Sequence, residues 1–228
     1  MAEKMKYPVA QIRVDNGLWD VPSEPLPNGM SGNFRANRVS QSTDDVFAIS
    51  PSFGSIAFVS LFLGIGIIVF SCFVYSWTRQ GFPLPEIPDF WSLVGWIAGS
   101  IFGSFCAVVF LNMFLDLLTR TTRFDKLADE MQRRSIFRTV LSLPLTDIVA
   151  VQCLYAGRAS GKGGSYDILQ LNLVVATGDA PRILLCTEPH EAWIRNTAGQ
   201  LAEFLGVPLV DQIAQTRAIY EANRFKWW

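Results

Sequence analysis

Two long stretches without a single charged residue constrain this sequence more than any other feature. No Asp, Glu, Lys or Arg occurs from Val46 to Thr78 or from Phe90 to Leu115. A helix that crosses the roughly 30 Å hydrocarbon core of a bilayer needs about 20 apolar residues. The segments 56–77 and 91–115 are long enough, and both carry aromatic side chains near their ends, where a membrane interface favours them. The sequence therefore predicts a two-helix transmembrane hairpin over residues 53–117.

Composition bears on two other interpretations. The chain has 228 residues, of which 50% are hydrophobic and 17% charged, and its formal net charge is -1. Two helices buried in a large core would also explain the charge-free stretches, but a chain of this size offers no interior able to surround them. A protein built around nucleic acid would normally show a strong basic excess. The charge balance therefore argues against a nucleic-acid partner.

Basic residues beside the two segments predict an orientation. The connecting loop 81–89 contains no Lys or Arg, whereas the region after the second segment is rich in them: Arg120, Arg123, Lys126, Arg133, Arg134 and Arg138. Basic residues near helix ends favour the cytoplasmic side of a membrane. We therefore expect a multi-pass protein of the cytoplasmic membrane with both termini in the cytoplasm.

The remaining sequence divides into three parts. Residues 1–52 are rich in Asn, Ser, Pro and Gly and are predicted to form an irregular cytoplasmic arm, in which a short strand at Val9–Val14 is possible. Residues 118–210 contain short strand patterns followed by an amphipathic helix over 189–205, with Gly206 placed to end it. Residues 211–228 form a tail, of which 212–224 has the composition of a short helix.

Alternation is clearest in the strand predicted at 166–176. One face carries only apolar side chains, namely Leu169, Leu171, Leu173 and Val175. The other face carries Gln170 and Asn172, which is typical of a half-buried strand. Together with the following helix, this pattern predicts an α+β cytoplasmic domain: an antiparallel sheet or half-barrel capped by a C-terminal helix.

Three short segments resemble a known family. They are Arg123–Lys126, Leu143–Ile148 with Ala150 and Val151, and Ala202–Leu209. With the order of helices and strands, they resemble bacterial membrane proteins that carry a pleckstrin-homology-like domain, and in particular the photosystem I assembly factor family of cyanobacteria and chloroplasts. The resemblance implies a pleckstrin-homology-like fold and a non-catalytic role as a membrane scaffold or assembly factor.

Small residues mark a candidate helix-packing face in the second segment. Gly95, Gly99, Gly103 and Ala107 recur every four residues and would form a smooth groove along one face. In lipid, such faces let helix backbones approach closely. We expect this groove to meet Ser60 and Gly64 of the first segment, or the same groove of another protein.

Two further groups are candidates for surface contacts. The loop 156–165 lacks the spacing of a phosphate-binding P-loop, but Arg158 and Lys162 could contact anionic lipid, the alternative being a flexible hairpin loop. The last residues include Phe225, Trp227 and Trp228, which could dock on lipid headgroups or on a partner, or form a frayed end.

No catalytic, metal or cofactor site is predicted. His190 is the only histidine, and Cys153 and Cys186 have no histidine predicted nearby that would activate a thiol. The sequence thus favours a non-catalytic membrane-anchored scaffold or complex-assembly protein, with a membrane-protein partner or a second copy as its target and no small-molecule substrate. Two alternatives stay open, namely an anionic-lipid-binding membrane module and an accessory subunit of a membrane enzyme or transporter.

Overall fold

The computed structural model describes most of the chain outside the second charge-free stretch. The described residues are 9–14, 17–26, 36–79, 108–109, 111–112, 114–116, 119–135, 138–161, 164–176 and 182–224. Their helices and strands are β1 (Val9–Val14), β2 (Gly17–Pro22), β3 (Asn37–Ser42), β4 (Val46–Pro51), α1 (Phe53–Arg79), β5 (Thr121–Asp125), β6 (Glu130–Ser135), β7 (Arg138–Pro144), the 3-10 turn η1 (Leu145–Asp147), β8 (Ile148–Gly161), β9 (Gly164–Val175), β10 (Arg182–Glu188), α3 (Glu191–Leu205), β11 (Leu209–Asp211) and α4 (Ile213–Arg224).

The larger sheet has five antiparallel strands in the order β3-β4-β5-β6-β7. Its neighbours β4 and β5 are far apart in sequence, because α1 and the segment after it lie between them. Their register sets Phe47 opposite Phe124, and both side chains are fully buried. The segment 1–52, predicted to be irregular, contains four strands, and two of them belong to this sheet.

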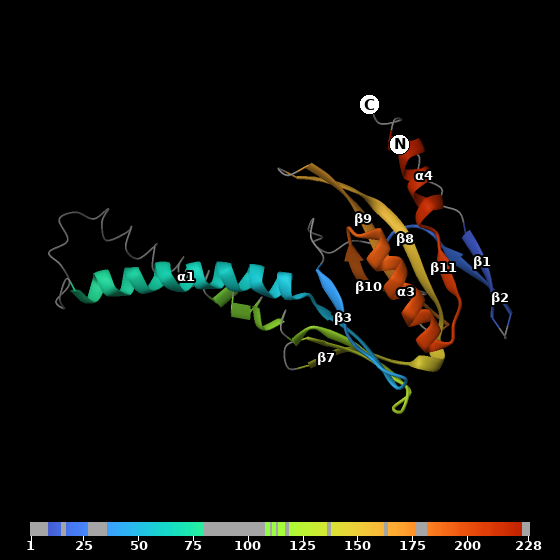
Figure 1. Ribbon diagram of the computed structural model, residues 1–228, viewed down its shortest axis with the longest axis horizontal. Helices are drawn as coiled ribbons and strands as arrows, with labels where there is room; N and C mark the ends of the chain where they lie inside the picture. The colour runs from blue at the N-terminus through green and yellow to red at the C-terminus, as the bar shows by residue number, and fades with distance from the viewer. Residues whose placement is uncertain are drawn as a thin grey trace.

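The second sheet has four strands in the order β10-β9-β8-β11, and β11 alone runs parallel to its neighbour. It packs against the first sheet around a common core (Figure 1). Helix α3 lies against β8 and β9, and α4 lies along β8. Tyr155 of β8 meets Tyr220 of α4 edge to face, with their ring centroids 5.4 Å apart.

Apolar side chains at every second position of the strands in the second sheet form this core. The prediction for 166–176 is confirmed on the core side, since Leu169, Leu171 and Leu173 of β9 are fully buried. Helix α3 is also confirmed, and Gly206 ends it in the left-handed conformation with φ 70°. Its buried face includes Ile194, Ala198 and Leu201.

The opposite face of β9 differs from the expectation of a solvent-facing surface. Gln170 and Asn172 are fully buried, because the chain after β2 covers this side of the sheet. Gln170 donates to the carbonyl of Leu26 at 2.7 Å and accepts from its backbone N–H at 3.0 Å. Arg182 donates to the carbonyls of Pro22 and Glu24 at 2.8 and 2.7 Å. A buried polar group needs such partners, so the amide and guanidinium groups fix the path of this segment.

The predicted transmembrane hairpin is wrong. Within the described part of the chain, no helix meets the combined requirement of length and apolar character for crossing a bilayer. The expected multi-pass location in the cytoplasmic membrane depended on that hairpin and is wrong with it. A long apolar stretch with few or no charges is typical of a spanning helix but does not by itself establish one. Most of the second segment, 91–115, lies outside the described residues. The described residues have an α+β fold rich in strands.

Candidate interaction site

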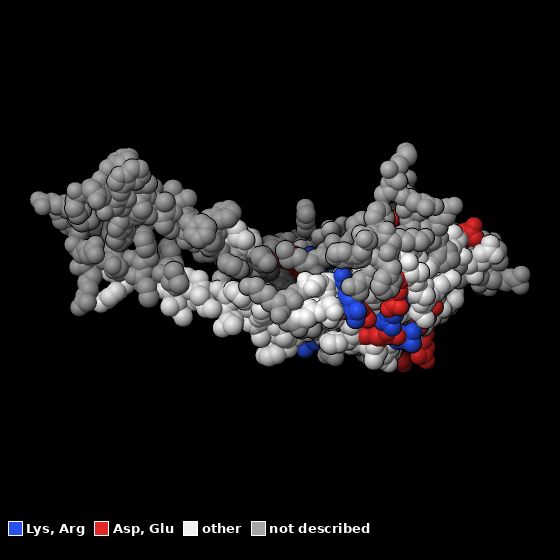
Figure 2. All heavy atoms as spheres, turned by 90° about the horizontal axis from the view of Figure 1, so that it is seen from above, with Lys and Arg blue, Asp and Glu red and all other residues white. Residues whose placement is uncertain are grey.

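Helix α1 presents an unusually apolar surface. Eight of its large apolar side chains are between 42% and 76% exposed: Phe53, Phe58, Leu61, Phe62, Ile65, Ile67, Ile68 and Tyr75. Figure 1 shows the helix extending away from both sheets, and in Figure 2 the visible coloured side chains, blue and red, gather on the sheet domain. Contiguous exposed apolar surface of this kind marks an interaction site.

The first turn of α1 is fixed to the sheet. Only Ser52 separates β4 from the helix, and its backbone N–H donates to the carbonyl of Ala36 at 2.8 Å. The hydroxyl of Ser55 donates to the same carbonyl at 3.0 Å, and the Ser55 N–H donates to the Ser52 hydroxyl at 3.2 Å. Ser52 and Ser55 are both buried. These hydrogen bonds hold the helix at a defined angle to the sheet.

One face of α1 is smooth as well as apolar. Ser60 and Gly64 lie four residues apart and therefore on the same side of the helix. The Ser60 hydroxyl donates to the carbonyl of Ile56 at 2.7 Å, so it needs no partner outside the helix. A Cβ atom added at Gly64 would meet nothing within 4 Å. Gly66 is equally open, but it lies about 200° around the helix from Gly64.

The other residues predicted to pack helices or to contact lipid lie outside the part of the chain that the structure describes. Gly95, Gly99, Gly103 and Ala107 are not among the described residues. The same holds for Lys162 of the predicted lipid-contact loop and for Phe225, Trp227 and Trp228 of the tail. Those predictions stay predictions. The structure brings Ser60 and Gly64 together on one face but does not test the rest.

Arg158, the described residue of the predicted lipid-contact pair, is part of an ion-pair network. Its Nε atom lies 3.3 Å from a carboxylate oxygen of Asp167, directly across the β8–β9 hairpin. The second oxygen of Asp167 lies 3.3 Å from Arg217, which also binds Glu191 at 2.7 Å. The charge of Arg158 is therefore shared with a neighbouring carboxylate, which weakens its attraction for an anionic surface.

The buried cysteines are poor nucleophiles. Burial raises the pKa of the Cys153 thiol to about 12, and the negative charge of Asp211 adds to the effect. Burial also raises the pKa of the fully enclosed Cys186 thiol. The thiolate is the reactive form of cysteine, so both side chains are held in the inert form at neutral pH.

We expect Cys153 to resist alkylation by iodoacetamide at pH 8 in the folded protein and to react readily in denaturant. The pKa is higher in the folded than in the unfolded chain, so the neutral thiol stabilises the fold below about pH 9 and this contribution is lost as the pH rises towards about 12. Mass spectrometry of the peptide containing Cys153 measures the labelling. Rapid labelling of the native protein would contradict the assignment.

The described residues do not assemble a metal centre, since no three His, Cys, Asp or Glu side chains among them lie close enough to hold an ion. His190, the residue before α3, is exposed, and its side chain makes no capping hydrogen bond. The expected absence of a cofactor remains a prediction.

Comparison with known proteins adds no further assignment. Neither protein-family models, nor curated proteins, nor solved structures gave a match to this chain. The resemblance to the photosystem I assembly factor family is therefore untested.

Proposed function

We propose that this protein is a non-catalytic scaffold that binds a protein partner through helix α1. The observation that carries the proposal is the exposed apolar surface of α1, held away from the sheets by the hydrogen bonds of Ser52 and Ser55. An apolar surface left in water is unfavourable by about 25 cal/mol for each square ångström that a partner could cover. A large exposed patch is accordingly the part of a protein surface with the strongest tendency to associate.

The chemistry of α1 favours a helix of another protein as the partner. Helices that lie in a membrane interface carry a strongly charged face, and α1 has no charged residue between Phe53 and Thr78. Ser60 and Gly64 instead provide a flat strip on which a second helix can pack closely, because neither presents a bulky side chain. Dispersion contacts between the two backbones would then add to the burial of Leu61 and Ile67 on either side of the strip.

Gly64→Leu tests this proposal. A leucine there would prevent close approach of the partner helix, and we expect at least a tenfold loss of the partner protein that co-purifies with the full-length chain. Gly66→Leu is the matched control, since it adds the same side chain to an equally open glycine on the opposite face. Quantitative mass spectrometry of affinity-purified, chemically cross-linked samples measures the ratio of partner to bait for each variant.

Two outcomes would contradict the proposal. One is an equal yield of partner with Gly64→Leu and Gly66→Leu, because the strip would then not be an interface. The other is full recovery of the purified protein with phosphatidylcholine vesicles in a flotation assay, independent of any protein partner. That second outcome would assign the apolar surface of α1 to lipid.

A further inference from the structure

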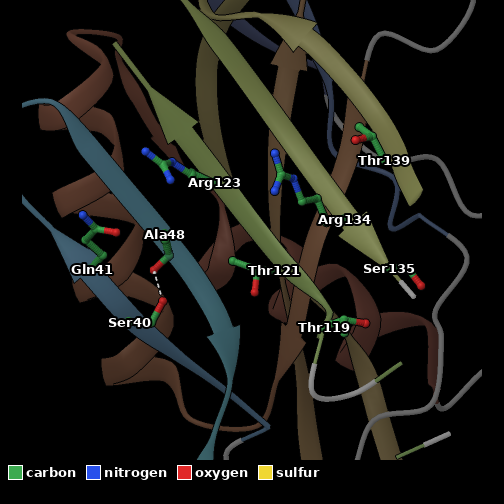
Figure 3. A pocket seen from close by; sticks show the side chains of 9 residues that line it. All are labelled: Ser40, Gln41, Ala48, Thr119, Thr121, Arg123, Arg134, Ser135 and Thr139. Carbon is green, nitrogen blue, oxygen red and sulfur yellow. Dashed lines mark hydrogen bonds between the residues drawn. The ribbon is translucent and has the colours of Figure 1, made fainter. Parts of the chain in front are cut away.

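A polar pocket lies on the face of the five-stranded sheet that points away from the core (Figure 3). Its volume is about 640 Å³, within the range of roughly 300–1,000 Å³ that is typical of small-molecule sites. The lining residues come from β3 to β7 and the segment before β5: Ser40, Gln41, Ala48, Thr119, Thr121, Arg123, Arg134, Ser135 and Thr139. The basic residues after position 119 are visible in the sequence, but only strand pairing shows which of them share a face.

Two arginines give this pocket its charge. Arg123 and Arg134 lie on the neighbouring strands β5 and β6, and Figure 3 shows both on the same side of the sheet. Arg123 is paired with Asp125 at 2.8 Å. Arg134 has no salt bridge among the described residues, and its Nη2 and Nε atoms donate instead to the side-chain oxygen of Gln132 at 2.8 and 3.1 Å. None of the described residues that line the pocket is acidic, so this part of the lining carries a net positive charge.

The hydrogen bonds around Arg134 hold its guanidinium in place. Gln132 donates its own amide N–H to Glu130 at 2.6 Å, which leaves its oxygen facing the arginine. Hydrogen bonds from Ser142 and Gln132 lower the pKa of Glu130, so this carboxyl is ionised at neutral pH. A guanidinium fork that is already oriented binds an oxyanion through two parallel hydrogen bonds. The positive charge of the pocket is therefore positioned before any ligand arrives.

Hydroxyl groups form the rest of the pocket. Ser40, Thr119, Thr121, Ser135 and Thr139 each contribute one, and Gln41 adds an amide. The Ser40 hydroxyl lies 2.8 Å from that of Ser50, which in turn lies 3.4 Å from that of Thr121. The Ser135 hydroxyl donates to the carboxylate of Asp116, which therefore lies beside the part of the pocket lined by Ser135. The lining residues that the structure describes include no aromatic side chain, so they offer no ring on which a nucleobase would stack.

We propose that this pocket binds a phosphate ester of a polyhydroxy compound. Arg134 and Arg123 take the phosphate, and the lining hydroxyls and the Gln41 amide exchange hydrogen bonds with the hydroxyls of the ligand. The volume exceeds what inorganic phosphate alone would fill, and the polar lining matches a sugar or glycerol moiety. This binding site is separate from the α1 surface and goes beyond the scaffold role.

Isothermal titration calorimetry of the full-length protein with glucose 6-phosphate at low ionic strength tests the proposal. We expect binding in the parent, at least a tenfold loss of affinity in Arg134→Gln, and little change in Arg195→Gln. The last variant removes the same charge from an exposed arginine on α3, far from any proposed contact in sequence and fold, and is the matched control. Glucose, which lacks the phosphate, should bind at least tenfold more weakly than its phosphate ester.

A second arm distinguishes a free ligand from a lipid headgroup. Vesicles that contain phosphatidylglycerol present the same phosphate–polyol chemistry on a surface, and phosphatidylcholine vesicles do not offer the hydroxyls. Binding to the first alone, lost in Arg134→Gln, would assign the site to a lipid headgroup. The proposal is overturned if neither glucose 6-phosphate nor phosphatidylglycerol binds, or if Arg134→Gln and Arg195→Gln reduce binding equally.

Discussion

Leu201→Asp is expected to abolish cooperative folding of the sheet domain. Leu201 of α3 is fully buried within the hydrophobic core cluster that the two sheets and α3 share. An ionised group without a partner in such a place is strongly unfavourable, and the lost apolar contacts add to the penalty. We expect a loss of more than about 4 kcal/mol in the free energy of unfolding, which is comparable to the whole stability of many domains.

Urea denaturation followed by circular dichroism measures this effect. Gln200→Asp is the matched control, because residue 200 is exposed on the same turn of α3 and receives the same new charge. The control should unfold within about 0.5 kcal/mol of the parent. A Leu201→Asp protein with the unfolding midpoint of the control would show that α3 does not close this core.

Glu188→Ala is expected to give the second largest loss of stability. Glu188 is fully buried at the end of β10, and its carboxylate accepts hydrogen bonds from the backbone N–H groups of Ala36 and Asn37 at 3.1 and 2.5 Å. It also accepts from the Asn37 side-chain amide at 2.8 Å. The truncated side chain would leave these partly buried donors without an acceptor, which costs about 1–3 kcal/mol for each group.

The hydrogen bonds of Glu188 join β10 of one sheet to the start of β3 of the other. We therefore expect the Glu188→Ala variant to weaken the contact between the two sheets. We expect a decrease of about 3 kcal/mol or more in unfolding free energy, together with faster hydrogen exchange at Asn37. Glu188→Gln keeps one acceptor oxygen and should lose less than half as much. A Glu188→Ala protein as stable as the parent would mean that the carboxylate does not hold the sheets together.

The sequence predicted the elements whose patterns are local. The alternation in β9 and the apolar face of α3 follow from the burial of one face of each element, and Gly206 occupies a conformation that other residues rarely adopt. The buried position of Gln170 and Asn172 could not be anticipated in this way. It depends on the segment Pro22–Leu26, which is more than a hundred residues distant in sequence.

The first strands of the larger sheet were missed for a related reason. The strand β3 is mostly polar, and β4 runs directly into the apolar sequence of α1, so neither shows a clear alternation with turn signals on both sides. Only pairing with β5, across the whole intervening segment, identifies them as part of the domain. The pocket lined by Arg123 and Arg134 could not be predicted from the sequence either, because strand register alone brings its arginines and hydroxyls together.

The charge-free stretches were interpreted too narrowly. Length and apolar character pointed to a membrane hairpin, and the described helices do not support it. The small residues Ser60 and Gly64, which the same interpretation singled out, do lie on one face of an exposed apolar helix. A run of apolar residues indicates that something covers the helix, but the identity of the covering molecule has to come from the surface itself.

Site-specific photo-cross-linking along α1 tests the scaffold role most directly. A photoreactive side chain at Ile68 lies about 40° around the helix from Gly64, whereas one at Phe62 lies about 160° away. Both positions are exposed, at 64% and 42%. We predict a discrete cross-linked protein product from Ile68 that is absent from Phe62 and disappears when Gly64→Leu is combined with the Ile68 label. Equal products from both positions, or none from Ile68, would contradict a protein partner on this face of α1.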